Sequence, residues 1–424
     1  MSSAASAVVE LHVEKPTAGG RMLARHDGQV VLVWGAIPGE RVRARIERSG
    51  KGVLFAETVD VLAASPDRRA GLADWRCGGN VLAHVAYERQ LHIKSEIIRD
   101  AFARIGRLPL DTPPSVVASP EAGYRMRARF HVRGGRIGFV REESHEICAA
   151  GPTAQMLPAT VEWIEEAEAR LHGDRARGLS SIEIAENIPA TERACHLELE
   201  PGTDARPFAA LATDAITGLS AQVLDRRAIE TLAGLPVISD SIGSLVLKRN
   251  VRAFFQGNRF LLETLVRHVR DLAPESAPLV DLYAGVGLFG LSFAAAGREE
   301  ITLVEGDSVS ARDLEANARP FLERTRVERS SVEDFLRHSQ AAPAATFVVD
   351  PPRTGMSREA VQGILRVTPA RLLYVSCDVA TLARDVRGLV DGGYALEQIS
   401  AFDLFPNTAH VESVCLLRRA VENG

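Results

Sequence analysis

The sequence predicts an α/β protein in which a glycine-rich βαβ unit is preceded by a small β-barrel and a central α+β domain. Two observations lead to this prediction. An apolar run ends at Asp281, a glycine-rich turn and a helix follow, and a second apolar run ends on Glu305. Residues 8–62 are short alternating segments between glycine-containing turns, a pattern typical of a small barrel. We therefore divide the chain into residues 1–62, 63–250 and 251–424.

The composition is that of an ordinary soluble globular protein. Of 424 residues, 46% are hydrophobic and 25% charged, which is enough apolar material for sizeable cores. No apolar run reaches the roughly 18 residues of a membrane span, and the first residues lack the build of a signal peptide. Five scattered cysteines predict free thiols in a reducing cytoplasm rather than a disulfide framework. Because the net charge is −5, nucleic-acid binding would require a local basic surface.

The predicted N-terminal barrel contains a row of basic residues. Arg41, Arg43 and Arg45 alternate with apolar residues, which places the three arginines on one face of a strand. Barrels of this size with basic faces often bind single-stranded nucleic acid. From this row alone, a solvated strand face is about equally probable.

The central part carries a predicted helix over residues 87–105 and a predicted hairpin over residues 124–140. The hairpin interleaves basic and aromatic residues, which suits phosphate contacts and base stacking, and an ordinary exposed hairpin is the alternative. The basic residues are Arg125, Arg127, Arg129, Arg133 and Arg136, and the aromatic ones are Tyr124, Phe130 and Phe139. Cys77 has no partner at C-x-x-C spacing, because Asn80 occupies that position, so no metal site is predicted.

The glycine-rich turn indicates a site for a nucleotide-like cofactor. Gly285, Gly287 and Gly290 have the G-x-G-x-x-G spacing of a dinucleotide site. Glu305 lies where an acid would accept hydrogen bonds from ribose hydroxyls. An S-adenosylmethionine site uses the same geometry, and Asp281 before the turn favours that interpretation. Glycines that merely tighten a strand–helix turn are the structural alternative.

Three further segments place reactive side chains at predicted strand ends, where the ligand crevice of an open α/β sheet lies. Asp350, in a proline-stiffened turn, can orient substrate or cofactor, or simply end its strand. Cys377 precedes a helix whose N-terminus favours the thiolate, although a lone cysteine is more often a small buried hydrophobe. Glu412 could serve as a general base, although a single glutamate is more often solvated or paired. Cys195 and Cys415 lack such a setting and are predicted to be core residues.

One reaction uses all of these parts. C5 of uracil is too electron-poor to take a methyl group directly, but a thiolate that adds to C6 makes C5 a nucleophile. C5 can then attack the sulfonium methyl group of S-adenosylmethionine, and a base must remove the C5 proton before the thiolate can leave. Such chemistry needs a cofactor loop, a thiolate and a carboxylate around one flipped base.

The chain resembles the class I S-adenosylmethionine-dependent RNA 5-methyluridine methyltransferases that carry an N-terminal TRAM domain. The matching motifs are Phe254 to Asn258, Asp281 to Gly287, Asp350 to Gly355, Ser376-Cys377 with Thr381 to Asp385, Phe405-Pro406 with His410 to Glu412, and Pro38 to Val42 in the TRAM-like region 8–69. The resemblance implies a Rossmann-like catalytic domain after an OB-like barrel. It also implies Cys377 as nucleophile, Glu412 as base, and four cofactor or pocket residues: Gln256, Tyr283, Glu305 and Asp350. Gly285 would let the cofactor approach the backbone.

Two departures from the family pattern stand out. Several relatives hold an iron–sulfur cluster on four cysteines, whereas here only Cys77 matches, with Asn80 and Gly71 at two of the other positions. We therefore expect no iron–sulfur cluster. The family's Asn-Pro after the nucleophile is Asp378-Val379 here. A carboxylate that pointed at the thiol would raise the pKa of that thiol.

The sequence thus predicts a cytoplasmic, monomeric RNA uridine C5-methyltransferase that uses S-adenosylmethionine and acts on ribosomal or transfer RNA, without a membrane or a metal. Two alternatives remain at this point. One is a catalytically impaired RNA-binding homologue, suggested by Asp378-Val379. The other is an NAD-dependent oxidoreductase, which the glycine pattern alone would allow but which leaves Cys377 and Glu412 unexplained.

Overall fold

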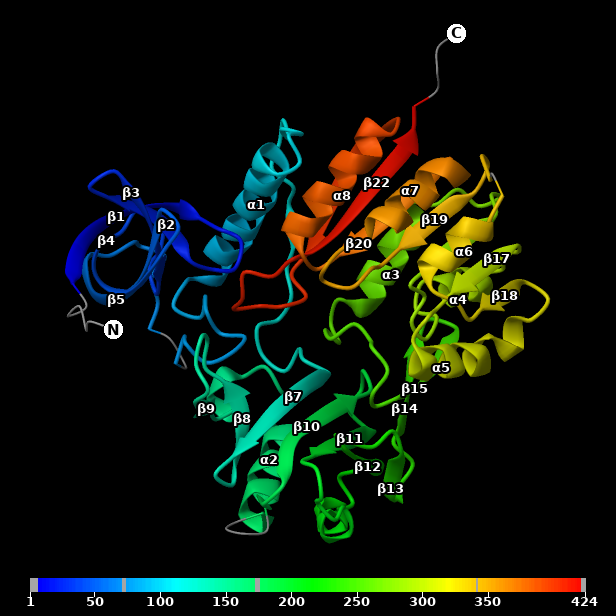
Figure 1. Ribbon diagram of the computed structural model, residues 1–424, viewed down its shortest axis with the longest axis horizontal. Helices are drawn as coiled ribbons and strands as arrows, with labels where there is room; N and C mark the ends of the chain where they lie inside the picture. The colour runs from blue at the N-terminus through cyan, green and yellow to red at the C-terminus, as the bar shows by residue number, and fades with distance from the viewer. Residues whose placement is uncertain (1–6, 71–73, 172–175, 341, 421–424) are drawn as a thin grey trace.

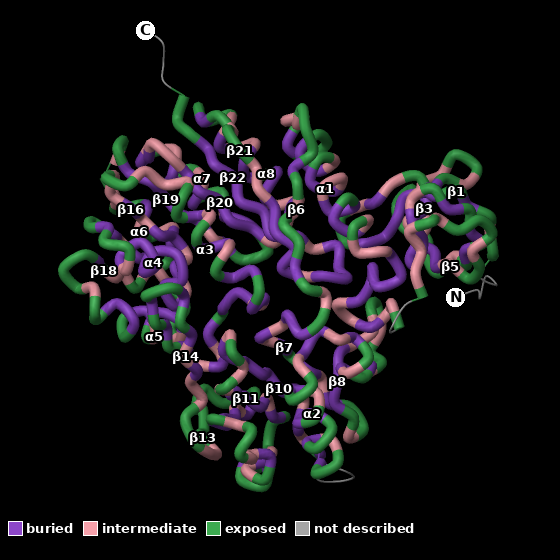
Figure 2. The backbone as a smooth tube through the Cα atoms, turned by 180° about the vertical axis from the view of Figure 1, so that it is seen from behind, coloured by how far each residue is buried: buried purple, intermediate pink, exposed green. Residues whose placement is uncertain are grey.

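The computed structural model describes residues 7–70, 74–171, 176–340 and 342–420. Figure 1 shows three regions: an N-terminal barrel, a separate sheet low in the view, and a larger α/β region that contains the C-terminal strand. Figure 2 shows that strands β20 and β22 of the α/β region are largely buried. Within the described part of the chain, no helix has the length and apolarity needed to cross a bilayer.

The N-terminal region is a closed barrel with the strand order β1-β2-β3-β5-β4. The strands are β1 (Val8–Pro16), β2 (Met22–His26), β3 (Gln29–Trp34), β4 (Arg41–Gly50) and β5 (Val53–Ala63). The predicted basic row lies on β4, but neighbouring strands neutralise much of it. Arg41 pairs with Glu10 at 3.1 Å, and Arg43 pairs with Asp60. The row therefore offers less free positive charge than its sequence suggests.

The central region is a seven-stranded sheet with the order β13-β12-β11-β10-β7-β8-β9, and helix α2 packs against it. Its elements are β7 (Arg127–Arg133), β8 (Arg136–Val140), β9 (Ile147–Cys148), α2 (Pro158–Arg170), β10 (Leu179–Glu186), β11 (Arg193–Leu199), β12 (Gly218–Val223) and β13 (Ile229–Gly234). A separate hairpin, β14 (Val237–Ile242) and β15 (Leu245–Asn250), leads to the C-terminal region.

The predicted hairpin is present as β7 and β8, but its aromatic residues do not face solvent. Tyr124, Phe130 and Phe139 are at most 6% exposed, and Phe130 packs on Phe139 with ring centroids 4.9 Å apart. Alternation along β7 sends the aromatic residue inward and the arginines outward. The prediction that these aromatics stack on bases is therefore wrong, because Phe130 and Phe139 pack in the core of the sheet and Tyr124 is buried, with its hydroxyl donating to the Pro406 carbonyl.

The structure also corrects the prediction that all cysteines are free. Cys77 and Cys148 form a disulfide across a sequence separation of 71 residues. Both side chains are buried, and the bond ties the segment before residue 80 to strand β9. Cys195 and Cys415 are buried and free, as predicted for core cysteines, and Cys377 is half-buried and free.

Reduction of this disulfide is expected to lower the free energy of unfolding by about 4 kcal/mol, because a cross-link across 71 residues restricts the unfolded chain strongly. Urea unfolding with and without dithiothreitol measures the difference. The double variant Cys77→Ala/Cys148→Ala is the control, since its unfolding should not respond to the reductant. Identical curves for the unchanged protein in both conditions would contradict the expectation.

The C-terminal region is built on an eight-stranded sheet with the order β18-β17-β16-β19-β20-β22-β21-β6. Its strands are β6 (Val116–Val117), β16 (Leu279–Leu282), β17 (Ile301–Val304), β18 (Thr325–Glu328), β19 (Thr346–Val349), β20 (Arg371–Ser376), β21 (Tyr394–Phe402) and β22 (Glu412–Arg419). Strands β16 to β20 run parallel, and β22 inserts antiparallel beside β20.

Helices cover both faces of this sheet, because its central strands are apolar on both sides. Along β19, Val348 packs in the cluster with α3, α4 and α5, whereas Phe347 and Val349 pack in the cluster with α1, α6, α7 and α8. The helices are α1 (Tyr87–Arg104), α3 (Leu262–Asp271), α4 (Gly290–Ala295), α5 (Ser308–Ala318), α6 (Val332–His338), α7 (Arg358–Val367) and α8 (Val379–Asp391).

A segment from the middle of the chain completes the C-terminal sheet. Strand β6 pairs with the end of β21, and Ile98 and Phe102 of helix α1 pack in the same cluster as α8. These elements fall within residues 63–250, which the sequence analysis assigns to a central domain. The division into three domains stays a proposal, with residues 87–117 as a segment that packs on the C-terminal sheet.

Candidate active site

Three carboxylates meet at one edge of the C-terminal sheet. Asp281 lies in β16, Glu305 directly follows β17, and Asp350 directly follows β19. The register pairs Asp281 with Leu303 and with Val348, so parallel strands carry all three acids to the same edge. The strand order reverses here, since β16 lies between β17 and β19, and this is the position where open α/β sheets bind ligands.

The glycine-rich turn between β16 and α4 leaves room for a ligand at one glycine only. A Cβ on Gly285 would meet nothing within 4 Å. By contrast, a Cβ on Gly287 would collide with Leu291, and one on Gly290 with Leu303. Gly287 and Gly290 therefore serve close packing, and Gly285 is the position at which a ligand can approach the backbone.

Glu305 and Asp281 hold this turn in place. Glu305 Oε2 accepts a hydrogen bond from the Gly285 amide at 2.7 Å, and Asp281 Oδ2 accepts one from the Gly290 amide at 2.7 Å. Asp281 is 1% exposed, and its Oδ1 has no hydrogen-bond partner among the described residues. Burial, with smaller contributions from Asp350 and Glu305, raises the pKa of Asp281 to about 8. Tyr283, in the same turn, is half-buried with a positive φ of 61°, and burial raises its pKa.

Gln256 reaches the same edge from the segment before α3. Its Nε2 donates to Asp350 Oδ2 at 3.2 Å. Burial raises the pKa of Asp350 to about 7, and the Gln256 hydrogen bond opposes that change. The structure thus brings together the predicted residues Gln256, Gly285, Glu305 and Asp350.

Cys377 and Glu412 face each other at the next pair of strands. Cys377 directly follows β20, and Glu412 is the first residue of β22. Because β20 and β22 are antiparallel and Ser376 pairs with Ser413, the residues one step further, Cys377 and Glu412, are neighbours across the ladder. Glu412 is 1% exposed, and neither of its carboxylate oxygens has a hydrogen-bond partner among the described residues.

Burial shifts both groups toward their neutral forms in the free protein. Burial, followed by the charges of Glu412 and Asp350, raises the pKa of Cys377 to about 12, and Arg353 acts in the opposite direction. Burial and the charge of Asp350 raise the pKa of Glu412 well above its usual range. A buried carboxyl group without hydrogen bonds is a strong base once it is ionised.

Sequence reasoning missed Arg353 as a site residue. It lies in the turn after β19, three residues beyond Asp350, and its charge lowers the pKa of both Cys377 and Glu412. The available signal was its place in the Asp350-Pro351-Pro352-Arg353 motif, since a turn at the carboxyl end of a strand lies beside the ligand crevice.

The unusual Asp378 caps helix α8 in the structure. Its Oδ1 accepts a hydrogen bond from the Thr381 amide at 2.8 Å, as expected of an N-cap aspartate. Asp378 is not among the groups that raise the pKa of Cys377. Asp378 therefore serves as the N-cap residue of α8.

Helix α1 anchors the loop before Glu412. Lys94 and Asp403, both fully buried, form an ion pair, and Lys94 Nζ also donates to the Phe405 carbonyl at 2.9 Å. Asn258 Nδ2 donates to the Leu404 carbonyl at 3.1 Å. These contacts tie the loop before Glu412 to α1 and to the segment that carries Gln256.

The region that corresponds to the cluster site of some relatives does not suit an iron–sulfur cluster. The thiol of Cys77 is bonded to Cys148, and the next position is the amide side chain Asn80. Gly71, at another of these positions, lies outside the described residues. Among the described residues no group of three or more potential metal ligands occurs.

Comparison with known proteins agrees with this geometry. Residues 323–420 match the tRNA (Uracil-5-)-methyltransferase family, and residues 6–59 match the TRAM domain. The chain is 30% identical over 420 residues to the 23S rRNA (uracil(1939)-C(5))-methyltransferase RlmD of Pseudomonas putida, covering 96% of this chain and 92% of that protein. The enzyme of the same name from Halomonas elongata is 31% identical over 432 residues, with coverages of 96% and 89%.

A solved structure shows the same fold over nearly the whole chain. It is the tRNA (uracil-54, C5)-methyltransferase of Pyrococcus abyssi in complex with S-adenosyl-L-homocysteine, with a TM-score of 0.78 and 24% identity, covering 96% of this chain and 99% of that one. The 30% and 31% identical relatives are RNA methyltransferases, so the chain belongs with them and not with the NAD-dependent oxidoreductases. With the residue matches above, this places the chain in the family of S-adenosylmethionine-dependent RNA (uracil-5-)-methyltransferases with an N-terminal TRAM domain.

Proposed function

We propose that this protein methylates C5 of a uridine in ribosomal RNA through a covalent bond between Cys377 and C6 of the base. The main support is the position of Cys377 directly across the β20–β22 ladder from Glu412, beside Asp350. This arrangement presents a thiol and a carboxyl group to one base at the ligand-binding edge of the sheet. Ribosomal RNA is the proposed substrate class because the two full-length relatives with at least 30% identity described above act on 23S rRNA.

S-adenosylmethionine supplies the methyl group when it is bound. The residues that would hold it are Gln256, Tyr283, Gly285, Glu305 and Asp350. Three observations fit a nucleoside-containing cofactor: the open space at Gly285, the unpartnered Asp281 Oδ1, and the half-buried Glu305 carboxylate. Each Glu305 oxygen accepts one backbone hydrogen bond and has a second lone pair for a ribose hydroxyl.

Cys377 and Glu412 act at different stages of the proposed reaction. The Cys377 thiolate forms a bond to C6, and the electron pair of the C5–C6 bond makes C5 the nucleophile. After C5 has gained the methyl group, ionised Glu412 takes the C5 proton, C5=C6 re-forms and the thiolate leaves. Burial makes Glu412 a stronger base than an exposed carboxylate, because its raised pKa favours the protonated product.

Arg353 is proposed to favour the thiolate. Its guanidinium is exposed, and its charge lowers the pKa of Cys377 against the effects of burial, Glu412 and Asp350. The same charge is available to a uracil carbonyl oxygen or a phosphate beside the flipped base.

The activity of the enzyme is expected to rise with pH between about 7 and 9. Burial raises the pKa of Cys377 to about 12, so the thiolate fraction should increase roughly tenfold per pH unit over this range, and ionisation of Glu412 changes in the same direction. The measurement is kcat/KM against pH, with Arg353→Gln as a second variant. Arg353→Gln should be slower at each pH because the pKa of Cys377 then rises further. A profile that is flat or falls with pH would contradict this assignment.

The RNA class is tested in cells. Nucleosides from purified ribosomal and transfer RNA are compared between cells with and without the gene by mass spectrometry. We expect 5-methyluridine to decrease in ribosomal RNA when the gene is deleted, and to return with the unchanged gene but not with a Cys377→Ala copy. Loss from transfer RNA alone would overturn the proposed substrate class. Unchanged 5-methyluridine in both classes would count against the activity itself.

A further inference from the structure

The tip of the β7–β8 hairpin carries two arginines without carboxylate partners. Arg133 and Arg136 face each other across the Gly134-Gly135 turn, and both side chains are exposed. No described carboxylate forms an ion pair with either of them. The other two arginines of β7, by contrast, have carboxylate partners. Arg127 pairs with Glu183, and Arg129 with Glu198 at 3.2 Å.

A hollow of about 430 Å³ lies beside this tip. It is lined by Arg133, Arg136, Arg141, His145, Glu146 and Ile147. Arg141 is fixed in the wall by ion pairs with Asp74 at 2.6 Å and with Glu146 at 3.0 Å. The hollow therefore combines one neutralised arginine with two arginines whose charge is not balanced by a described residue.

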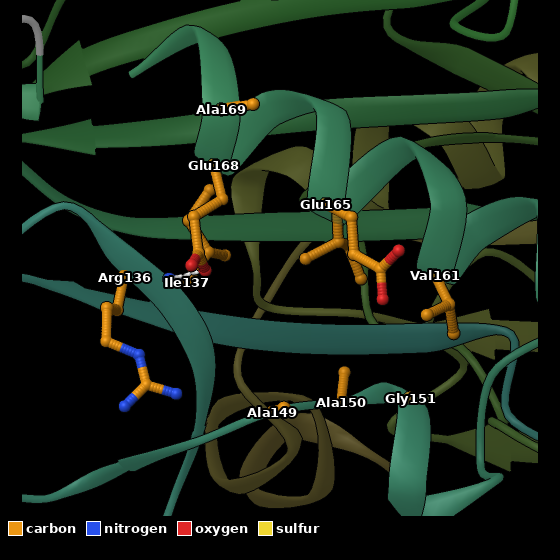
Figure 3. Close-up of a pocket in the computed structure, with 10 residues that line it drawn as sticks. Arg136, Ile137, Ala149, Ala150, Gly151, Val161, Glu165, Glu168 and Ala169 are labelled. Atoms are coloured by element: carbon orange, nitrogen blue, oxygen red, sulfur yellow. Dashed lines mark hydrogen bonds between the residues drawn. The ribbon is translucent and has the colours of Figure 1, made fainter. Parts of the chain in front are cut away.

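The nearby acids of helix α2 do not neutralise the tip. Figure 3 shows Arg136 extending away from Glu165 and Glu168, which line the adjoining cavity. Glu168 Oε2 instead accepts a hydrogen bond from the Ile137 amide at 2.8 Å. The Glu168 carboxylate thus binds the hairpin backbone and does not pair with the Arg136 guanidinium.

The tip is attached to a rigid support. Strand β8 pairs with β9 through Phe139 and Cys148, and the Cys77–Cys148 disulfide joins β9 to the segment before residue 80. A Cβ on Gly138 would collide with the Cys148 carbonyl, so β8 and β9 approach very closely. The backbone that carries the two arginines is therefore fixed before any ligand binds, which lowers the backbone entropy lost on binding.

The opposite end of β7 lies near the proposed active site. Arg127 lies 5.9 Å from the ring centroid of Phe254, two residues before Gln256. Arg133 lies six positions after Arg127 in β7, and at about 3.3 Å per residue the tip is about 20 Å further along the strand. A polymer that enters the active site could span this distance within a few nucleotides.

We infer that Arg133 and Arg136 bind phosphates of the RNA that flanks the target uridine. This inference rests on the proposed function and identifies where the RNA backbone runs. Arginine guanidinium groups suit phosphates because they donate two parallel hydrogen bonds to one phosphate. With a net charge of −5, the protein needs such local basic sites to hold a polyanion. The occupant is the RNA backbone rather than an acidic protein, because the tip lies along the strand that leads from the active site.

The test compares two double variants of the full-length chain. The hairpin variant is Arg133→Gln/Arg136→Gln. The control, Arg326→Gln/Arg337→Gln, removes the same charge from two exposed arginines of β18 and α6, which pair with Glu328 and Asp334. The probe is 23S ribosomal RNA transcribed in vitro, and its Kd is measured at several salt concentrations.

The loss of two phosphate contacts should make the negative slope of log K (the association constant) against log salt concentration shallower by about 1.4. This change corresponds to roughly tenfold weaker binding at 0.15 M salt. The control pair should keep the slope of the unchanged protein. S-adenosylhomocysteine affinity, the unfolding temperature and kcat at saturating RNA should stay the same in both variants. An unchanged slope for the hairpin variant, or an equal loss in the control, would overturn the inference.

The two proposals can fail separately. If the unchanged protein binds the RNA but forms no 5-methyluridine, the proposed function fails while the slopes still decide the role of the hairpin. The inference is wrong if methylation is normal and the hairpin variant keeps the salt dependence of its RNA binding. If that variant also loses binding to an acidic protein, the surface serves a protein partner.

Discussion

Replacement of Cys377 by alanine is expected to abolish methyl transfer. Without the thiol no bond to C6 can form, and C5 of uracil stays too electron-poor to take up a methyl group. Loss of a nucleophile costs on the order of 10⁴-fold or more in kcat, which would place turnover below detection. The measurement is transfer of labelled methyl groups from S-adenosylmethionine to RNA, together with a denaturing gel for a covalent protein–RNA complex.

The variant should remain folded and bind its cofactor. Cys377 is half-buried at a strand end, so its truncation leaves no large cavity in the core. S-adenosylhomocysteine should raise the unfolding temperature of Cys377→Ala as much as that of the unchanged protein. Cys195→Ala, which removes a thiol in the central sheet, is the matched control and should keep its activity. Turnover by Cys377→Ala, or an adduct on another cysteine, would refute the assignment of the nucleophile.

Replacement of Glu412 by glutamine is expected to stop the reaction after methyl transfer. Because burial favours the neutral form of Glu412, a neutral side chain of the same shape should leave folding and RNA binding intact. Glutamine cannot remove the C5 proton, so the methylated uridine should stay bonded to Cys377. Loss of a general base costs about 10²–10⁴-fold in turnover. The trapped complex should survive denaturing electrophoresis and carry label from the methyl group.

The control for this variant removes a carboxylate elsewhere in the same sheet. Glu397→Gln on β21 breaks an exposed ion pair with Arg418 and should turn over normally. Normal turnover by Glu412→Gln would show that another group removes the proton. A Glu412→Gln protein that forms no labelled adduct would place Glu412 earlier in the reaction than we propose.

Local patterns were sufficient to identify several parts of the site. Asp281, Glu305 and Asp350 each mark the end of an apolar run, and ends of parallel strands necessarily meet at one edge. The position of Cys377 between a strand and a helix followed from the same kind of pattern. The sequence could not show which glycine leaves room for a ligand. Gly287 and Gly290 are needed for packing, because Leu291 and Leu303 lie against them, and only the folded chain creates these contacts. Gly285 has no such neighbour.

Charge was the property that the sequence predicted least well. Arg41, Arg43 and Arg127 have carboxylate partners on neighbouring strands, and the strand register decides these pairs. The sequence also could not show that the hairpin aromatics are buried. Alternation along β7 divides its side chains between two faces, but it does not say which face packs against helix α2. A charged residue in a sequence therefore gives no measure of the free charge on the surface.

The sequence by itself determined the barrel at the N-terminus, the strand–turn–helix–strand unit around the glycine-rich turn, and the placing of Glu305, Asp350 and Cys377 directly after strands. These features depend on hydrophobic periodicity and turn residues within short windows. Only the tertiary structure decided that Glu412 faces Cys377, that Cys77 bonds to Cys148, and that α1 and β6 complete the C-terminal sheet. Each of these contacts joins residues tens to hundreds of positions apart, so packing of the whole chain, rather than any local preference, selects them.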